Sequence, residues 1–307
     1  MSAKKTGKPV ALKKGDLIGV VSPGAAVDPQ ALERGVACLE AAGFRVRLGQ
    51  AVLRRNGYLA GSDAERLADL REVYTDPEVK AVIAARGGYG CGRLLSAAPI
   101  IRPDDPVKAF VGHSDLTFLL TDLVQRSRMV AFHGPLVAGL DASSPAVDAL
   151  TDLLTGNQCG WQQQASEVIR PGTASGVLVG GCLSIITAMV GTPYAVATRH
   201  RLLFLEEVNE KPYRIDRMLV QLRQAGALDE VAGVIFGEMP GCSAGPGEAV
   251  SVRDVIAEVF RDAPYPVAFG VPSGHGRGTA ILPFGVRAQL SADRLILLES
   301  PFTVPSA

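Results

Sequence analysis

The sequence predicts an α/β protein in which helices cover both faces of a mostly parallel sheet. Two observations support this class. Short apolar runs alternate with amphipathic helical stretches along the first half of the chain. The runs are almost continuously apolar, which is typical of strands buried on both faces of a parallel sheet.

The elements of the first half follow one another in a regular order. Each expected strand is a short apolar run, and each expected helix carries apolar residues at helical spacing. Strands are expected at 17–21, 44–48, 79–84, 107–111 and 129–132, and helices at 29–42, 63–74, after 115 to about 125, and 145–154.

A polar stretch from Gly156 to Gly176 interrupts this pattern and indicates a crossover between two domains. We expect an N-terminal domain at 1–157, a linker at 158–175 and a C-terminal domain at 176–307. The three closing strands have no helix between them, which favours an antiparallel element in a mixed sheet. In this second domain, strands are expected at 177–179, 202–205, 231–236, 266–270, 280–284, 286–290 and 294–299, and helices at 181–189, 213–224 and 252–260.

Composition narrows the class of protein. The 307 residues include 31 Lys plus Arg and 31 Asp plus Glu, so no basic excess indicates binding to nucleic acid. The five cysteines are scattered without a CxxC pair, which argues against a disulfide framework or a structural zinc site. No apolar run is long enough to span a membrane and the N-terminus has no signal-peptide core. We therefore expect a cytoplasmic protein that binds no membrane, metal or cofactor.

A candidate nucleophile lies between an apolar strand and a helix. The segment Gly112-His113-Ser114-Asp115 occupies the place where a sharp strand-to-helix turn exposes a serine hydroxyl. The amide of Asp115 would then lie at a helix N-terminus, where it can bind developing negative charge. The alternative is that Ser114 or Asp115 only caps the helix.

The preceding strand is followed by a glycine-rich segment, Arg86-Gly87-Gly88-Tyr89-Gly90. Glycines there let backbone amides approach a ligand closely. The segment does not fit GxGxxG, because Arg93 stands at the last position, so it does not predict a dinucleotide site. A simple tight turn is the alternative.

The general base for a serine is usually histidine, and four are present. His113 adjoins Ser114, His133 lies at a strand end, and His200 lies in a polar run. His275 lies in a glycine-flanked loop that could carry an imidazole to a site. Carboxylates that could orient it, Glu206 and Glu207, end an apolar strand, and the pattern alone does not choose between them.

Taken together, these motifs resemble the LD-carboxypeptidases, the serine peptidases that act on muramoyl tetrapeptide in peptidoglycan recycling. The resemblance runs from Gly15 to about Phe284. It also rests on segments 21–23, 112–117, 133–135, 180–183, 205–207, 213–217 and 274–276.

The resemblance implies a catalytic triad of Ser114, Glu206 and His275. The family commonly has Asp where this chain has Glu207, which supports Glu206. The amides of Asp115 and of Gly88, in the 87–90 loop, would form the oxyanion hole. Cys182, in a similar Gly-Gly-Cys turn, is interpreted as a buried apolar residue rather than a second nucleophile.

The resemblance further implies a flavodoxin-like N-terminal domain, a swivelling C-terminal domain, and a homodimer without metal. The expected substrate is a small peptide or muropeptide that loses its terminal D-alanine. Arg86 is the first candidate to bind the terminal carboxylate, and Tyr89 is a further substrate-binding candidate. Arg217 and Arg277 are the alternatives for the carboxylate, and Arg86 could instead only brace the loop.

Three rival functions share these features. A microcin C immunity peptidase would use the same triad to cleave a peptide–nucleotide conjugate. A binding module for muropeptides would lack catalysis, although no triad residue is missing here. A nucleotide-binding α/β protein is disfavoured because the phosphate fingerprint is absent.

Overall fold

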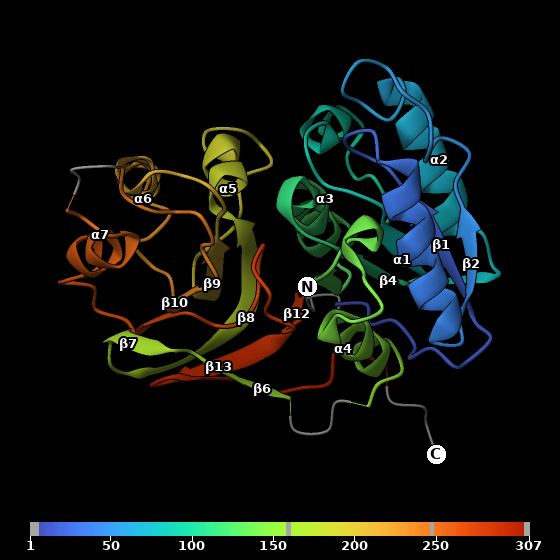
Figure 1. The fold of residues 1–307 in the computed structure, drawn as a ribbon. Helices are drawn as coiled ribbons and strands as arrows, with labels where there is room; N and C mark the ends of the chain where they lie inside the picture. The colour runs from blue at the N-terminus through green and yellow to red at the C-terminus, as the bar shows by residue number, and fades with distance from the viewer. Residues whose placement is uncertain (1–5, 158–160, 246–248, 304–307) are drawn as a thin grey trace. The chain divides into compact units, whose positions relative to one another are not determined.

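The computed structural model describes residues 6–157, 161–245 and 249–303. Contacts between Cα atoms divide the chain into two compact units (Figure 1). Unit 1 comprises Met1–Cys159, Ile281–Gly285 and Ser300–Ala307, and unit 2 comprises Gly160–Ala280 and Val286–Glu299.

Unit 1 is a sheet flanked by helices. Its strands lie in the order β12-β5-β4-β3-β1-β2, and all neighbours are parallel except β12, which pairs antiparallel with β5. The order 2-1-3-4-5 of its parallel strands is that of flavodoxin-like sheets. The elements are β1 (Leu17–Val21), α1 (Pro29–Ala41), β2 (Arg45–Leu48), α2 (Asp63–Thr75), β3 (Val79–Ala84), η1 (Cys91–Ala97), β4 (Ala109–Gly112), η2 (Ser114–Leu116), α3 (Thr117–Asp122), η3 (Leu123–Ser127), β5 (Ala131–His133), η4 (Val137–Gly139), α4 (Pro145–Leu154) and β12 (Leu282–Phe284).

The helices of unit 1 begin where the sequence supplies caps. The side chain of Asp28 accepts a hydrogen bond from the amide of Ala31 before α1. Ser62 and Glu65 form a reciprocal capping box at α2. Every residue of β1 and β4 is buried, because helices cover both faces of the central strands.

Unit 2 is a mixed sheet in the order β6-β14-β13-β8-β9-β10-β11-β7. Strands β8 to β11 are parallel, and the outer strands pair antiparallel. Helices α6 and α7 pack side by side, and α5 contacts α6 (Figure 1). The elements are β6 (Gln162–Gln164), β7 (Glu167–Arg170), β8 (Thr173–Cys182), α5 (Leu183–Met189), β9 (Arg201–Glu206), α6 (Pro212–Gln224), β10 (Gly233–Phe236), α7 (Val252–Val259), β11 (Val267–Phe269), β13 (Arg287–Ser291) and β14 (Arg294–Leu297).

The two sheets confirm the predicted α/β class, with a mostly parallel N-terminal sheet and a mixed C-terminal one. None of the helices in the described ranges is long and apolar enough to cross a bilayer.

Two details differ from the expected domain limits. The described part of the predicted linker contains β6, β7 and the start of β8, and β6 and β7 are the two edge strands of the second sheet. Edge strands have one unpaired side and tolerate polar residues, so they carry a weak strand signal in sequence. Strand β12 returns to the first sheet, where Leu282 pairs with His133 and Phe284 with Ala131.

Candidate active site

The predicted site residues lie at the carboxyl ends of parallel strands in each unit. In unit 1, the glycine loop follows β3 and Ser114 follows β4. In unit 2, Glu206 ends β9 and the loop carrying His275 follows β11. This edge of an open α/β sheet is where ligands usually bind.

Ser114 occupies a sharp turn. It has a φ of 63°, a left-handed conformation that is uncommon for residues other than glycine. Such strain is typical of functional turns, and it matches the strand-to-helix turn of nucleophilic serines. A Cβ on Gly112 would lie 2.8 Å from the Cγ atom of Leu116, so only glycine fits at the start of the turn. The turn continues through η2 into α3.

The glycine loop touches this turn directly. A Cβ on Gly87 would lie 3.0 Å from the Cβ of Ser114 and 3.3 Å from its Oγ. Gly88 and Gly90 have φ values of 87° and 136°. Any side chain at Gly87 would therefore crowd the serine.

Asp115 links the turn that carries Ser114 to Cys91, the residue that follows the glycine loop. Its carboxylate is buried and accepts a hydrogen bond of 2.8 Å from the amide of Cys91. Burial raises the pKa of Asp115, and this hydrogen bond opposes the rise. The side chain of Asp115 thus braces the loop, whereas the role expected for its amide remains a prediction, as does that of Gly88.

Arg66 is a residue that the sequence analysis missed. Its side chain is only 1% exposed, and its Nη1 donates to the carbonyl of Gly90 at 3.0 Å and to that of Pro23. Its Nη2 pairs with Asp63 at 2.5 Å. A buried arginine needs such partners. Arg66 therefore fastens the glycine loop to the turn after β1.

The two predicted substrate-binding residues of this loop are exposed. Arg86 donates from Nη1 to the carbonyl of Ala26 at 2.9 Å, which supports the bracing alternative. Tyr89 is 54% exposed and contacts Tyr58. The alternatives Arg217 and Arg277 belong to unit 2, where the Arg217 guanidinium lies 5.7 Å from the ring centre of Tyr213.

In unit 2, Glu206 and His275 form a hydrogen-bonded pair. The distance from the His275 Nδ1 to the Glu206 Oε2 is 2.6 Å, and the His275 backbone amide donates to the same oxygen at 3.2 Å. Glu206 is fully buried, and the His275 side chain is 16% exposed. A carboxylate can only accept, so it selects the tautomer with the proton on Nδ1 and leaves Nε2 as the basic nitrogen.

The electrostatics of the pair favour a protonated imidazole. Burial acts to lower the pKa of His275, whereas the hydrogen bond and charge of Glu206, followed by the charge of Glu207, act to raise it. The net pKa lies above the ordinary value for histidine. A base of this kind can take a proton from a hydroxyl and hold the resulting cation beside Glu206.

Glu207 has a different task. Its Oε2 accepts from the amide of Ser184 at 2.7 Å, and its Oε1 accepts from the amide of Val208 at 2.9 Å. It therefore caps the start of α5, because successive residues of a strand point to opposite sides. Glu206 therefore hydrogen-bonds to His275, whereas Glu207 binds the amides of Ser184 and Val208, and the catalytic role of Glu206 stays a prediction.

Cys182 lies next to both glutamates and is 4% exposed. It pairs with Glu206 in the register of β8 and β9, and its Sγ lies 3.5 Å from each carboxylate oxygen of Glu207. Burial, and then the charges of Glu206 and Glu207, raise the pKa of the Cys182 thiol well above its usual range. A neutral thiol is a poor nucleophile, which fits a packing role.

Glu238, also missed from sequence, organises the loop that carries His275. It follows β10, accepts from the amide of Gly278 at 2.9 Å, and donates from its own amide to the carbonyl of Ser273 at 2.9 Å. A Cβ on Gly276 or Gly278 would overlap its carboxylate, and one on Gly274 would lie 2.8 Å from the Glu206 Oε2. The glycines let this loop close around two carboxylates.

Comparison with known proteins decides the family. Residues 18–134 match the LD-carboxypeptidase N-terminal domain, and residues 175–290 match the LD-carboxypeptidase C-terminal domain. A probable murein peptide carboxypeptidase of Bacillus subtilis is 38% identical over 301 residues, covering 95% of this chain and 94% of that protein. The chain belongs to the LD-carboxypeptidase family. It is therefore an enzyme of the serine type.

Two solved structures support the same family fold. A muramoyltetrapeptide carboxypeptidase from Oxalobacter formigenes is 28% identical, with a TM-score of 0.80 and coverage of 92% of this chain and 97% of that one. The microcin C7 self-immunity protein MccF in its wild-type apo state gives a TM-score of 0.87, covering 96% and 99% of the two chains. Its identity of 22% shows likeness of fold alone.

The remaining histidines of this LD-carboxypeptidase have structural partners. The His113 Nδ1 lies 2.9 Å from the carbonyl of Gly134, and the rings of His113 and His133 are 5.9 Å apart. The backbone amide of His200 donates to the carbonyl of Glu230. Within the described ranges, no group of three or more His, Cys, Asp or Glu side chains could hold a metal ion.

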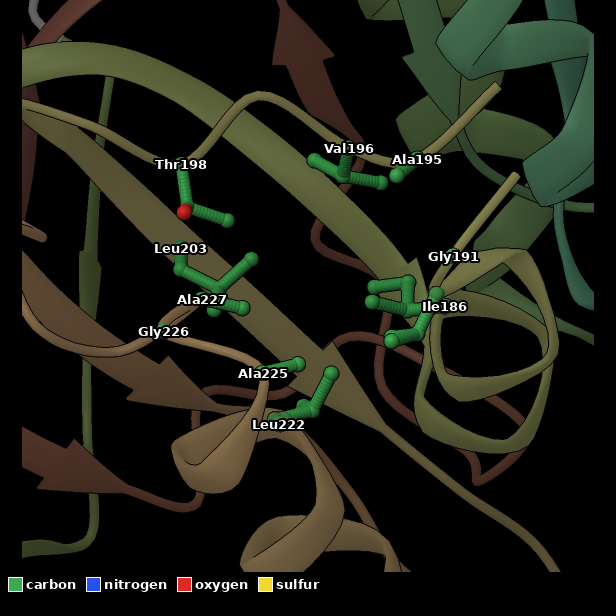
Figure 2. A pocket seen from close by; sticks show the side chains of 11 residues that line it. Ile186, Gly191, Ala195, Val196, Thr198, Leu203, Leu222, Ala225, Gly226 and Ala227 are labelled. Carbon is green, nitrogen blue, oxygen red and sulfur yellow. The ribbon is translucent and has the colours of Figure 1, made fainter. Parts of the chain in front are cut away.

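A pocket of about 190 Å³ in unit 2 lies apart from this chemistry (Figure 2). None of its lining side chains carries an acid or a base. The lining residues are Ile186, Val190, Gly191, Ala195, Val196, Thr198, Leu203, Leu222, Ala225, Gly226 and Ala227.

Proposed function

We propose that this LD-carboxypeptidase releases the terminal D-alanine from muramoyl or murein tetrapeptide, by cleaving an L,D-peptide bond. The observation that carries the proposal is the buried Glu206–His275 pair, with its 2.6 Å hydrogen bond. The names of two similar proteins, the murein peptide carboxypeptidase and the muramoyltetrapeptide carboxypeptidase, support the choice of substrate. We further propose a cytoplasmic homodimer.

The proposed mechanism assigns one role to each member of the triad. The Ser114 Oγ attacks the carbonyl of the scissile bond while the His275 Nε2 takes its proton. Glu206 holds the imidazole and stabilises its cation. The backbone amides of Asp115 and Gly88 are the proposed donors to the oxyanion.

Collapse of the tetrahedral intermediate breaks the C–N bond. His275 passes its proton to the leaving amine, and D-alanine departs from an acyl-enzyme on Ser114. Water then attacks the ester, with His275 again taking the proton, and the shortened peptide leaves. In this scheme Arg86 binds the substrate's terminal carboxylate through the guanidinium nitrogens that do not bond to Ala26.

The test is to incubate the purified protein with L,D- and L,L-linked tetrapeptides and to identify the released amino acid by mass. We expect D-alanine from the L,D peptide alone, and a loss of about 10^4- to 10^6-fold in Ser114→Ala. Near-normal turnover by that variant, or release of an internal fragment, would contradict the proposal.

A further inference from the structure

An exposed pair of tyrosines lies beside the glycine loop. Tyr58 is 66% exposed and Tyr89 is 54% exposed. Their ring centres are 5.6 Å apart, and the ring planes meet at 67°. Burial in the core does not account for two large rings that remain mostly in solvent, and exposed aromatic clusters commonly mark ligand-binding surfaces.

The backbone fixes the position of this pair. Tyr58 lies in a tight hairpin in which the amides and carbonyls of Asn56 and Leu59 bond to each other. The carbonyl of Tyr58 accepts from the amide of Ala26 at 3.0 Å. The amide of the neighbouring Ala25 donates at 3.1 Å to Gly87. Two backbone hydrogen bonds therefore link the Tyr58 hairpin, through Ala25 and Ala26, to Gly87, the residue that lies against Ser114.

Polar groups flank the rings. Arg93 donates from Nε to both oxygens of Asp63, at 2.8 and 3.0 Å. Arg93 lies four residues after Tyr89, and the hydrogen bond and charge of Asp63 raise its pKa. The two aromatic rings with polar groups beside them form a surface that suits a ligand ring with an apolar face and a polar rim.

A pyranose ring has this character, because its C–H bonds present a weakly positive face to the negative face of an aromatic ring while its hydroxyls stay at the rim. The distance from the glycine loop to the tyrosines also agrees with the distance from the cleaved bond to the sugar. Tyr89 is two residues from Gly87, a span of at most about 7 Å, and its side chain extends the distance further. Three peptide residues separate the cleaved bond of a muramoyl tetrapeptide from its sugar, a span on the order of 10 Å.

We propose that Tyr58 and Tyr89 form a binding subsite for the muramoyl sugar of the substrate. The proposal rests on the proposed function, and it makes the enzyme selective for sugar-bearing tetrapeptide over the free peptide. Tyrosine suits this task because few rotatable bonds are ordered when a ring stacks on its ligand.

The test compares kcat/KM for N-acetylmuramoyl tetrapeptide and for the free tetrapeptide, with released D-alanine as the readout. Tyr58→Ala should lower the ratio of these two values by about threefold to tenfold. Tyr58→Phe keeps the ring and should retain the wild-type ratio. Leu53→Ala is the matched surface control, because Leu53 is 56% exposed and lies five residues before Tyr58.

The outcomes separate the two proposals. Failure to release D-alanine from either substrate would defeat the proposed function itself. Release with the same ratio in wild type and Tyr58→Ala would overturn the sugar subsite alone. If Tyr58→Ala lowered kcat/KM only for a peptide–adenylate conjugate, the sugar subsite would also be overturned, because the rings would then bind a nucleobase. A change in the oligomeric state of Tyr58→Ala without a change in the ratio would overturn it as well.

Discussion

Replacing Glu206 by glutamine should disable the base while keeping its shape. The Oε2 of Glu206 accepts two hydrogen bonds, from the Nδ1 and from the backbone amide of His275. A glutamine can accept both only with its carbonyl oxygen in that place. Its amide group in the same place would oppose the His275 amide and select the wrong tautomer of the ring.

The expected loss of kcat in Glu206→Gln follows from the loss of the negative charge of Glu206. Glu206 is fully buried and 2.6 Å from the imidazole, so its replacement removes a negative charge that directly stabilises the imidazolium formed in the transition state. Loss of the corresponding carboxylate in a serine triad costs about 10^4-fold in kcat. We expect a loss of about 10^3- to 10^4-fold here, with a smaller change in KM.

Glu207→Gln is the matched control. It removes one of the two acceptors that bind Ser184 and Val208, so we expect a loss of about 1–3 kcal/mol in the free energy of unfolding. Because Glu207 does not contact the imidazole, kcat should fall less than tenfold. Steady-state kinetics and denaturant unfolding of both variants separate a catalytic loss from a structural one.

The pH profile gives a second readout. The base must be neutral to act, so kcat/KM rises with pH through the pKa of His275, which lies above its ordinary value. Glutamine removes the main interactions that raise this pKa, and burial then dominates. The acid limb of residual activity should move clearly to lower pH in Glu206→Gln and only slightly in Glu207→Gln, because the charge of Glu207 is the smallest of the influences that raise this pKa. Equal kinetic damage from both variants, with no shift of the limb, would refute the assignment.

Four further outcomes are expected. Gly87→Ala should lower kcat by about tenfold to 100-fold, because its methyl group would crowd Ser114, whereas Gly139→Ala, with open space around it, is the kinetic control. Arg66→Met should cost about 2–4 kcal/mol of unfolding free energy and also lower kcat, since the carbonyls of Pro23 and Gly90 lose their donor. Arg71→Met, on the same helix, removes bonds to the carbonyls of Ala97 and Ile100 and should affect stability but not kcat. EDTA should leave activity unchanged, and inactivation that zinc restores would contradict the triad mechanism. Amidating the terminal D-alanine should reduce kcat/KM by about tenfold to 100-fold, and Arg86→Lys should reproduce part of that loss on the free acid only.

Sequence reasoning places the candidate residues at strand ends, and the structure has them there. The apolar runs before Ser114 and Glu206 define where β4 and β9 stop, and the carboxyl ends of parallel strands share an edge of their sheet. The residue pattern alone does not choose between Glu206 and Glu207, although the family resemblance favours Glu206. That choice depends on the pleat of β9 against β8, where Cys182 pairs with Glu206, and a residue pattern alone does not set it.

The missed residues share a different property. Arg66 and Glu238 are held mainly by backbone carbonyls and amides, which every sequence segment offers, so their partners leave no recognisable pattern. Arg66 lies on α2 among acidic residues and has the pattern of a solvated helix face, although the side chain is buried. The short η1 helix was also missed, because a 3₁₀ turn lacks the 3.6-residue period.

The candidate residues of each unit lie beside a loop that is held in a similar way. In unit 1, Gly87 allows a loop to lie against Ser114. Arg66 holds this loop through the carbonyl of Gly90, and Asp115 binds the amide that follows it. In unit 2, Gly274 allows a loop to lie against Glu206, and Glu238 holds that loop through the amide of Gly278 and the carbonyl of Ser273. Arg66 and Asp115 are buried, and buried charges are costly unless every partner is present. Charged side chains that hold a loop at a strand end in each unit therefore indicate that each loop is fixed, which is the condition for a preorganised catalytic group.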